Sequence, residues 1–293
     1  MTHKKPQVSI IFPAKNEGEN VQSTLDSLFN TKTNIKFETI IVDDGSTDGC
    51  CDFLKNNPWK NQVKLVRTTG VGAANARNSG SNIAEGEYLI FCDAHLNFEN
   101  WWIDRLLQPI LTGKTDVVSP AIASITEPDK VGYGMSLNHL LKVYWNKKRS
   151  NLFETAVLPG GCLLIPKKVF NDVGGFESGF KTWGHEDVEL SIKLWLFGYR
   201  CTIQPNVKVF HLFRKSHPYH VSNDDIYYNL LRLAYSHFNQ MRIQKCKKLI
   251  KQTNPLKIEK LVIQDGVKLQ RQLYFEKRKF DDNWYFNKFN IPF

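Results

Sequence analysis

The sequence predicts an α/β fold in which helices flank a mostly parallel central sheet, with a helical extension at the C-terminal end. Short apolar runs typical of strands recur between segments whose apolar residues have helical spacing. This alternation is typical of βαβ units, in which helices cover both faces of a parallel sheet. At 293 residues, the chain is long enough for one large domain, or for one domain with an appendage.

The predicted elements follow one another regularly in the first third of the chain and less regularly afterwards. We expect strands at residues 8–14, 37–42, 63–67 and 88–93, with helices at 18–30, 73–84 and 99–111. Beyond these we expect strands at 116–124 and 207–214, a short strand within 158–170, a helix from residue 186, and an irregular segment at 126–157.

Polar residues stand where three of these strands end. They are Pro13–Glu17, the pair Asp43–Asp44, and Asp93 with His95. Ligands of such sheets bind beyond the carboxyl ends of the strands. The three signals therefore predict one binding site at this edge of the sheet.

Composition is ordinary for a globular protein, with 42% hydrophobic and 23% charged residues. No apolar stretch approaches the roughly 18–20 residues that a spanning helix needs. The N-terminal stretch lacks the apolar region and cleavage site of a signal peptide, so we expect a cytoplasmic protein. The six cysteines form neither a CxxC pair nor a disulfide framework, which predicts buried free thiols.

The net charge of +10 is concentrated at the C-terminal end, where residues 223–293 contain 14 Lys/Arg against 7 Asp/Glu. We therefore divide the chain into a domain at 1–222 and a basic, mainly helical extension at 223–293. The helical periodicity of 224–252 and the aromatic residues near the end predict a packed element, on the domain or in a homodimer. Its charge suits an anionic partner such as a membrane surface, or is simply a solvated helical face.

The Asp93-x-His95 pair is the first candidate metal site. Alternate residues of an extended chain share a face, so both side chains can point at one object. A carboxylate oxygen and an imidazole nitrogen together suit a cation such as Mn²⁺, although a turn aspartate beside a surface histidine is an alternative. A third candidate ligand, His211, stands at the end of a distant strand.

Glu186 and Asp187 begin a predicted helix directly after a glycine. Acidic residues in a first turn are favoured by the helix dipole, which is one interpretation of the pair. Two carboxylates at such a position also suit a general base beside a substrate. Gly160 and Gly161 allow close approach of the backbone to a ligand, or form a turn or bulge.

Seven motifs together resemble family 2-like glycosyltransferases of the GT-A, Rossmann-like fold. They are VSIIFPAKNE, IIVDDGSTDG, the G-x-x-x-A-R-N of Gly72–Asn78, FCDAHL, PGGCLLI, GHEDVEL and FHLFRKSHPY, and they span about residues 6–220. The Asp-x-His and His-x-Phe-Arg motifs more particularly resemble polypeptide N-acetylgalactosaminyltransferases. The Glu-Asp pair instead resembles inverting enzymes of the chondroitin-polymerase and β-1,4-galactosyltransferase types, because the first group has Glu-Asn there.

The resemblance implies a UDP-sugar donor and a Mn²⁺ or Mg²⁺ ion held by Asp93, His95 and His211. It implies that Asp44 receives the uracil edge, and that Arg77 meets phosphate or orients the metal-binding carboxylate; a helix-surface arginine is the alternative for Arg77. The remaining donor-binding residues that it implies are Pro13, Ala14, Lys15, Glu17, Gly72, Gly160, Gly161 and, on a loop that closes over the diphosphate, Arg214, His217 and Tyr219.

The leading hypothesis is a metal-dependent, inverting transfer to a peptide, protein or glycan acceptor. Asp187 is then the general base, and Glu186 binds a sugar hydroxyl. The alternative is a retaining enzyme of the polypeptide N-acetylgalactosaminyltransferase type. A GT-A-like nucleotidyltransferase fits less well, because FPAKNEGEN lacks the expected glycine-rich loop. A non-enzymatic nucleic-acid-binding module has no supporting motif, and we expect no nucleic-acid partner.

Overall fold

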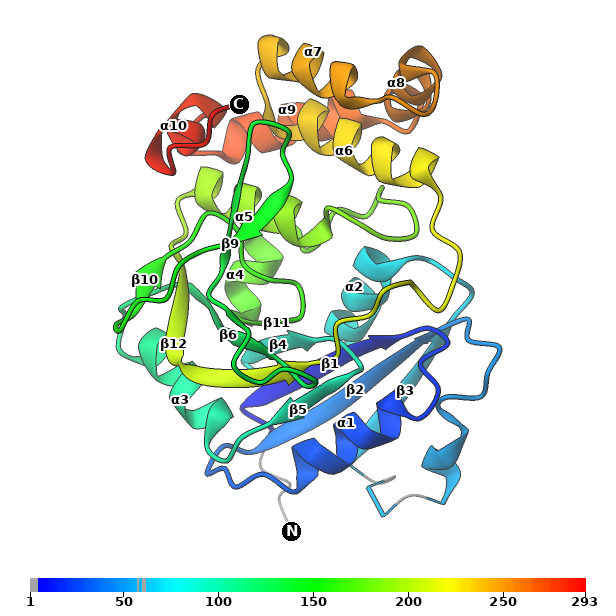
Figure 1. Ribbon diagram of the computed structural model, residues 1–293, viewed down its shortest axis with the longest axis vertical. Helices are drawn as coiled ribbons and strands as arrows, with labels where there is room; N and C mark the ends of the chain where they lie inside the picture. Colours follow the sequence, from blue (N-terminus) through cyan, green and yellow to red (C-terminus); the bar gives the residue numbers. More distant parts are fainter. Residues whose placement is uncertain (1–4, 57, 60–61) are drawn as a thin grey trace.

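The computed structural model describes residues 5–56, 58–59 and 62–293, and a ten-stranded sheet runs through it (Figure 1). Its strands are β1 Val8–Ala14, β2 Phe37–Asp44, β3 Val63–Thr68, β4 Tyr88–Cys92, β5 Leu96–Phe98, β6 Val117–Ser124, β7 Val131–Gly132, β10 Phe153–Glu154, β11 Cys162–Pro166 and β12 Cys201–His211. The main order is β10-β12-β6-β11-β4-β1-β2-β3, with β5 beside β12 and β7 beside β6.

Most of the main strand pairs are parallel, as predicted. Strands β1 to β4 form a parallel block, and β12 is parallel to β6, whereas β11 lies antiparallel between β4 and β6. β4 and β6 are buried along their whole length, which explains why they are continuous apolar runs in the sequence. Because β1, β2 and β4 are parallel neighbours, the polar residues that follow them meet at one edge of the sheet.

Helices cover both faces of the sheet, as the alternating pattern predicted. Helices α1 and α3 pack into one core, while α2, α4 and α5 pack into the other. Their bounds are α1 Asn20–Phe29, α2 Ala73–Ile83, α3 Trp102–Leu111, α4 Lys167–Asp172 and α5 Glu186–Phe197, and a 3₁₀ turn lies at Asp52–Lys55.

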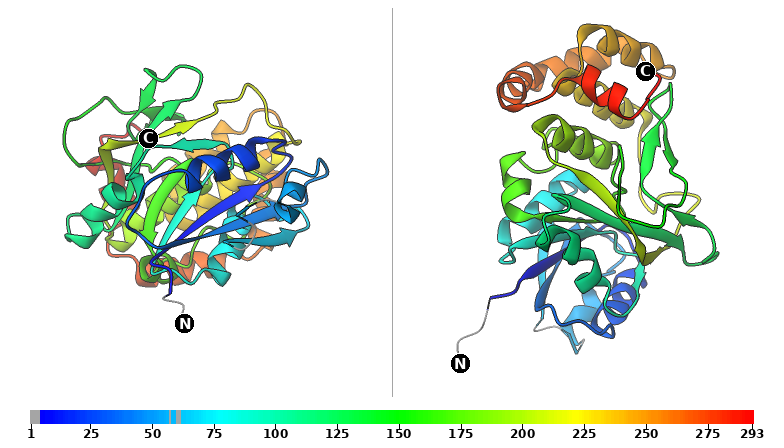
Figure 2. Two further views of the ribbon diagram at one scale, coloured as in Figure 1. Left: turned by 90° about the horizontal axis from the view of Figure 1, so that it is seen from below. Right: turned by 90° about the vertical axis from the view of Figure 1, so that its left-hand side faces the viewer.

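Five C-terminal helices lie over α5, at the end of the molecule opposite the N-terminus (Figure 2). They are α6 Asn223–His237, α7 Gln240–Leu249, α8 Pro255–Gln264, α9 Val267–Lys277 and α10 Asp282–Lys288. Leu231, Phe238 and Phe286 are buried in the same core as α5, which confirms the prediction of a packed element. The domain division, the homodimer and contact with a membrane surface stay predictions.

The helical structure expected within 224–252 is confirmed with a break, and two other sequence-based expectations need correction. The segment 224–252 is two helices, because the backbone is extended at Phe238 and Asn239 caps α7 by accepting a hydrogen bond from a backbone N–H. The strand expected at 207–214 begins at Cys201 and ends at His211, with a register shift after Gln204. The segment 126–157 contains short strands, including the hairpin of β8 Met135–Leu137 and β9 Val143–Trp145.

All six cysteines are buried free thiols, as predicted. Among the described residues, no helix has both the length and the apolar character needed to cross a bilayer.

A buried ionic network joins α5 to the C-terminal helices. The Glu189 carboxylate lies 3.2 Å from the Lys193 ammonium and 2.7 Å from Nε2 of His237 on α6. The Lys193 ammonium also donates a 2.7 Å hydrogen bond to the carbonyl of Gly175. Burial opposes the charge on Lys193, but the neighbouring negative groups, led by Glu189, together outweigh it and raise the pKa of the lysine. The three side chains therefore form a charged, hydrogen-bonded contact within the core.

Replacing Lys193 with alanine should lower the free energy of unfolding by about 3–5 kcal/mol, because it leaves a buried carboxylate without its main counter-charge. Urea unfolding followed by circular dichroism measures the loss. Lys248→Ala, which removes an exposed lysine from α7, is the matched control and should change stability by less than about 0.5 kcal/mol. Equal stability of the two variants would show that the network contributes nothing.

Candidate functional site

A cavity of about 290 Å³ lies beyond the carboxyl ends of β1, β2 and β4. Its wall contains most of the residues that the sequence singled out, including those from the segment after β12. They are Pro13, Ala14, Lys15, Glu17, Asp44, Gly72, Arg77, Asp93, His95, His211, Arg214, His217 and Tyr219. Gly160, Gly161, Glu186 and Asp187 line a second, adjoining cavity instead.

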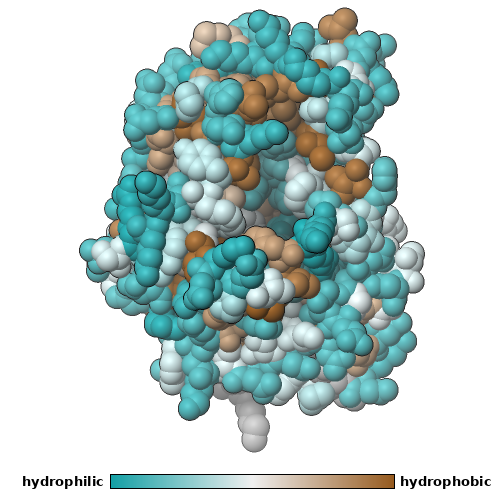
Figure 3. All heavy atoms as spheres, viewed as in Figure 1, coloured by the Kyte–Doolittle hydropathy of each residue, from teal (hydrophilic) through white to brown (hydrophobic). Residues whose placement is uncertain are grey.

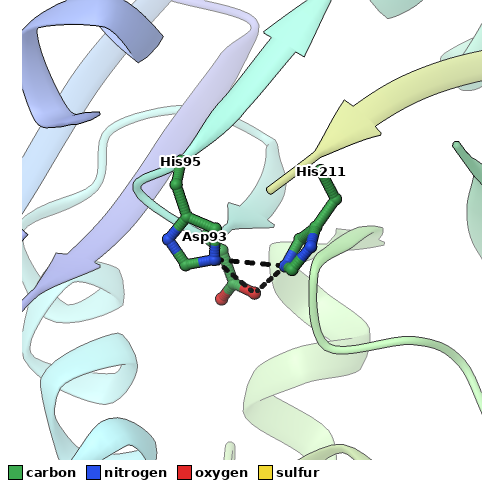
Figure 4. A group of neighbouring side chains, drawn as sticks. All are labelled: Asp93, His95 and His211. Carbon is green, nitrogen blue, oxygen red and sulfur yellow. Dashed lines mark hydrogen bonds and ion pairs between the residues drawn. The ribbon is translucent and has the colours of Figure 1, made fainter. Parts of the chain in front are cut away.

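Asp93, His95 and His211, which line the first cavity, form a compact cluster (Figure 4). Nε2 of His211 lies 3.2 Å from both Oδ2 of Asp93 and Nε2 of His95. In an octahedral site with bonds of about 2.1 Å, neighbouring ligand atoms lie about 3.0 Å apart. The third separation, between Nε2 of His95 and Oδ2 of Asp93, is 4.0 Å, so these two atoms lie nearer to the spacing of opposite ligands than of neighbouring ones. One carboxylate oxygen and two imidazole nitrogens in this arrangement suit a divalent ion such as Mn²⁺.

His95 is oriented by a carboxylate from the neighbouring strand end. Nδ1 of His95 lies 3.2 Å from Oε2 of Glu17, which leaves Nε2 free to face the cluster. The guanidinium of Arg214 also donates a hydrogen bond to each carboxylate oxygen of Glu17. Burial tends to raise the pKa of Glu17, but the hydrogen bonds from His95 and Arg214 hold it below its usual value. Glu17 therefore stays charged and links the cluster to the segment after β12.

Arg77 holds the other side of the cluster from α2. It is buried, and its guanidinium donates a 2.8 Å hydrogen bond to Oδ1 of Asp93 and a longer one of 3.4 Å to Glu186. Burial would raise the pKa of Asp93, but the hydrogen bond from His211 and the charge of Arg77 hold it well below its usual range. Arg77 thus orients a carboxylate of the cluster, as one of the sequence-based interpretations suggested.

Asp44 supports a glycine-containing loop at the mouth of the cavity. Its carboxylate accepts hydrogen bonds from the hydroxyl of Thr68 and from the backbone N–H groups of Val71 and Gly72, at 2.6, 2.6 and 2.9 Å. Gly72 has φ +88°, and a Cβ there would lie 3.0 Å from the carbonyl oxygen of Thr182. The sequence did not predict this support, and recognition of uracil by Asp44 stays a prediction.

The glycine pair allows its loop to pass close to the cluster. A Cβ on Gly161 would lie 3.2 Å from the ring of His211, and one on Gly160 would lie 3.2 Å from Cβ of Asp187. Asp187 in turn accepts a 3.1 Å hydrogen bond from the N–H of Gly160 and one of 2.8 Å from the N–H of Val188. Burial, followed by the negative charge of Glu186, raises the pKa of Asp187 to about 7.

The segment after β12 lies over the cavity. Leu212 and residues 214–219 line it, the ring of His217 packs 4.3 Å from that of Trp183, and Lys15 lies 5.5 Å from the ring of Tyr219. These contacts place Arg214, His217 and Tyr219 at the cavity, in agreement with their predicted location.

Sequence reasoning missed Trp183, which lines both cavities, and missed the contact of Glu17 with His95. The available signal for Trp183 was its place in the sequence, three residues before Glu186. For Glu17 the signal was its position after β1, the neighbour of β4.

A mostly parallel sheet with a cavity and a cluster of candidate metal ligands at its carboxyl edge is typical of GT-A glycosyltransferases. The family model for glycosyl transferase family 2 matches residues 9–174, and a model described as the N-terminal domain of galactosyltransferase matches residues 147–221. The chain belongs to glycosyl transferase family 2.

Curated relatives include polypeptide N-acetylgalactosaminyltransferases. Polypeptide N-acetylgalactosaminyltransferase 8 of Drosophila melanogaster is 31% identical to this chain. The match covers 72% of this chain and 39% of the Drosophila protein. Polypeptide N-acetylgalactosaminyltransferase 11 of Xenopus tropicalis is 30% identical, and the match covers 82% of this chain and 44% of the Xenopus protein. The chain thus spans about two fifths of the length of these relatives.

Solved structures confirm the predicted fold. GalNAc-T7, crystallised with UDP, GalNAc and Mn²⁺, superposes on this chain with a TM-score of 0.78 at 20% sequence identity. The superposition covers 98% of this chain and 57% of the GalNAc-T7 chain. The S. aureus protein TarS in complex with UDP-GlcNAc superposes with a TM-score of 0.59 at 18% sequence identity. The superposition covers 96% of this chain and 75% of the TarS chain.

Replacing Asp93, His95 or His211 singly with alanine should weaken Mn²⁺ binding at least tenfold, because each change removes one of three ligand atoms. Isothermal calorimetry measures the affinity, and circular dichroism checks that each variant is folded. His139→Ala, at an exposed histidine away from the cluster, should bind Mn²⁺ like the unchanged protein. Unaltered affinity in all three cluster variants would refute the metal site.

Asp187→Asn should stabilise the protein more at pH 8 than at pH 5. In the unfolded chain this carboxyl has an ordinary pKa near 3.9, so folding takes up a proton between about pH 4 and pH 7. The free energy of unfolding of the unchanged protein therefore falls as the pH rises through this range, and asparagine removes that fall.

Metal-free thermal unfolding from pH 5 to pH 8 tests this expectation, with Asp129→Asn as the exposed control. If the curves of Asp187→Asn and the unchanged protein stay parallel, the carboxyl does not titrate in this range.

Proposed function

We propose that the protein is a metal-dependent, retaining glycosyltransferase that moves N-acetylgalactosamine from UDP-N-acetylgalactosamine to a hydroxyl of a peptide or protein. The observation that carries the proposal is the cluster of Asp93, His95 and His211, which line the first cavity, with Arg77 behind it. This is the chemistry required to accept a departing nucleoside diphosphate.

The roles of the chain's own residues follow from their positions. A bound Mn²⁺ or Mg²⁺ would neutralise charge that develops on the diphosphate as it departs. Arg77 keeps Asp93 charged and aimed at the cluster, and Glu17 sets the ring of His95 so that Nε2 faces the same point. Leu212 and residues 214–219 line the cavity, and their role in the proposed reaction is to shield the donor from water and so limit its hydrolysis.

The similar proteins support the choice of donor. The relatives at about 30% identity are polypeptide N-acetylgalactosaminyltransferases. The structure of GalNAc-T7 was determined with UDP, GalNAc and Mn²⁺, and TarS was crystallised with UDP-GlcNAc. The similarity to the polypeptide-modifying enzymes favours a peptide or protein acceptor over a glycan.

These relatives favour retention of the anomeric configuration, the alternative in the sequence-based interpretation, over inversion. In support of retention, both oxygens of Asp187 accept backbone hydrogen bonds, from Gly160 and Val188. A side chain held in this way serves to position the glycine loop. Asp187 then needs no role as the general base of an inverting reaction.

Incubation with UDP-N-acetylgalactosamine, Mn²⁺ and a threonine-containing peptide should give a product with the donor's α-configuration, as determined by NMR. Donors with other sugars serve as the comparison, and the Asp93→Ala variant is the inactive control. A β-linked product would refute retention. Absence of transfer, of donor hydrolysis and of UDP binding together would refute the whole proposal.

The transfer rate of the Asp187→Asn variant gives a second test of retention against inversion. Retention predicts transfer within about tenfold of the unchanged protein, because asparagine is nearly isosteric and loses only one of the two backbone hydrogen bonds, a cost of about 0.5–1.5 kcal/mol. Loss of a general base would instead reduce transfer by about 10²–10⁴-fold.

A further inference from the structure

The second cavity, of about 780 Å³, adjoins the first. Arg77, Asp93 and Trp183 line both cavities, and Glu186 and Asp187 line only the second. Its volume lies within the range of about 300–1,000 Å³ in which proteins bind small molecules or short segments of a partner. An acceptor that enters this cavity reaches the residues beside the metal cluster, so the space is positioned to hold the acceptor of the proposed transfer.

Apolar side chains form most of the remaining wall. The face in Figure 3 is hollowed below the C-terminal helices, with hydrophobic residues around the hollow. The apolar residues that line the cavity come from the β8–β9 hairpin and from helices α6 and α7. They are Met135, Leu140, Leu141, Val143, Ile226, Tyr227, Leu230 and Leu249. A glycan with a hydroxyl on nearly every carbon would leave many of its polar groups without partners here, whereas apolar side chains of a peptide would be favourably buried.

Two lysines stand on different parts of this wall. Lys142 comes from the β8–β9 hairpin and Lys251 follows α7; both are exposed. Within the described part of the chain, neither ammonium lies within ion-pair distance of a carboxylate. The carboxylates that line the cavity are Asp93, Glu186 and Asp187, and Arg77 is paired with the first two. The outer part of the cavity is therefore positively charged.

We propose that this cavity binds a peptide acceptor whose serine or threonine is flanked by apolar residues and by at least one acidic residue, with Lys142 and Lys251 recognising the acidic side chain. The inference rests on the proposed function and adds the class of acceptor sequence to it. Complementary charge at the rim of a site mainly sets specificity and the rate of encounter, so the preference is expected in kcat/KM for the peptide.

The test compares three threonine peptides that share apolar neighbours and differ only in one outer residue, which is glutamate, glutamine or lysine. With the unchanged protein, kcat/KM should decrease in that order. Each lysine should contribute about two- to fivefold, the range of an exposed ion pair, and the preference should shrink as salt concentration rises.

The double variant Lys142→Glu, Lys251→Glu should reverse the order of the three peptides. The readout is the ratio of kcat/KM for the glutamate peptide to that for the lysine peptide within each variant, so differences in folded fraction or donor turnover cancel. Lys248→Glu is the matched control, because this exposed lysine belongs to α7 but does not line the cavity. Its ratio should equal that of the unchanged protein.

Two results separate the failure of this inference from failure of the proposed function. If the protein hydrolyses the UDP-sugar but the charge reversal leaves the peptide ratio unchanged, or a glycan is modified in preference to all the peptides, the acceptor inference is wrong. If the protein neither binds UDP nor hydrolyses any UDP-sugar, the proposed function fails and the acceptor inference fails with it.

Discussion

The buried guanidinium of Arg77 is the constraint around which the site is arranged. Only 4% of this side chain is exposed, so its charge must be compensated by groups within the protein. The compensation comes from Asp93, which follows β4, and from Glu186, which begins α5 more than ninety residues later in the chain. One cation on α2 therefore brings together the end of a central strand and the start of a buried helix.

The C-terminal helices complete this arrangement from outside. Helix α5 is buried almost throughout, because the sheet lies on one side of it and α6 to α10 on the other. A helix held on all sides fixes the position of its first turn, so Glu186 and Asp187 have little freedom to move. The same extension supplies one wall of the second cavity through α6 and α7. It thus contributes both to stability and to the shape of the space where we place the acceptor.

The sequence predicted the fold and the location of the site because both depend on periodicity and topology. Parallel strands bring their carboxyl ends to one edge, so Asp44, Asp93 and His95 were expected to meet there. Contacts made by long side chains across the site were not predicted, as with Glu17 and Arg214. Their pairing depends on the path of the segment after β12, which has no periodic pattern. The β8–β9 hairpin was missed for a similar reason, since strands of three residues are too short to show alternation.

The carboxylates at the site are stabilised in two different ways, and the difference bears on the chemistry. Glu17 and Asp93 each have a guanidinium within hydrogen-bond distance and stay charged in the folded protein. The side chain of Asp187 accepts hydrogen bonds only from backbone N–H groups in the described part of the chain, and burial beside Glu186 raises its pKa to about 7. A neutral side chain at position 187 keeps the shape of the carboxylate, but asparagine has a single oxygen to accept the two backbone hydrogen bonds. The aspartate alone therefore does not establish an inverting mechanism.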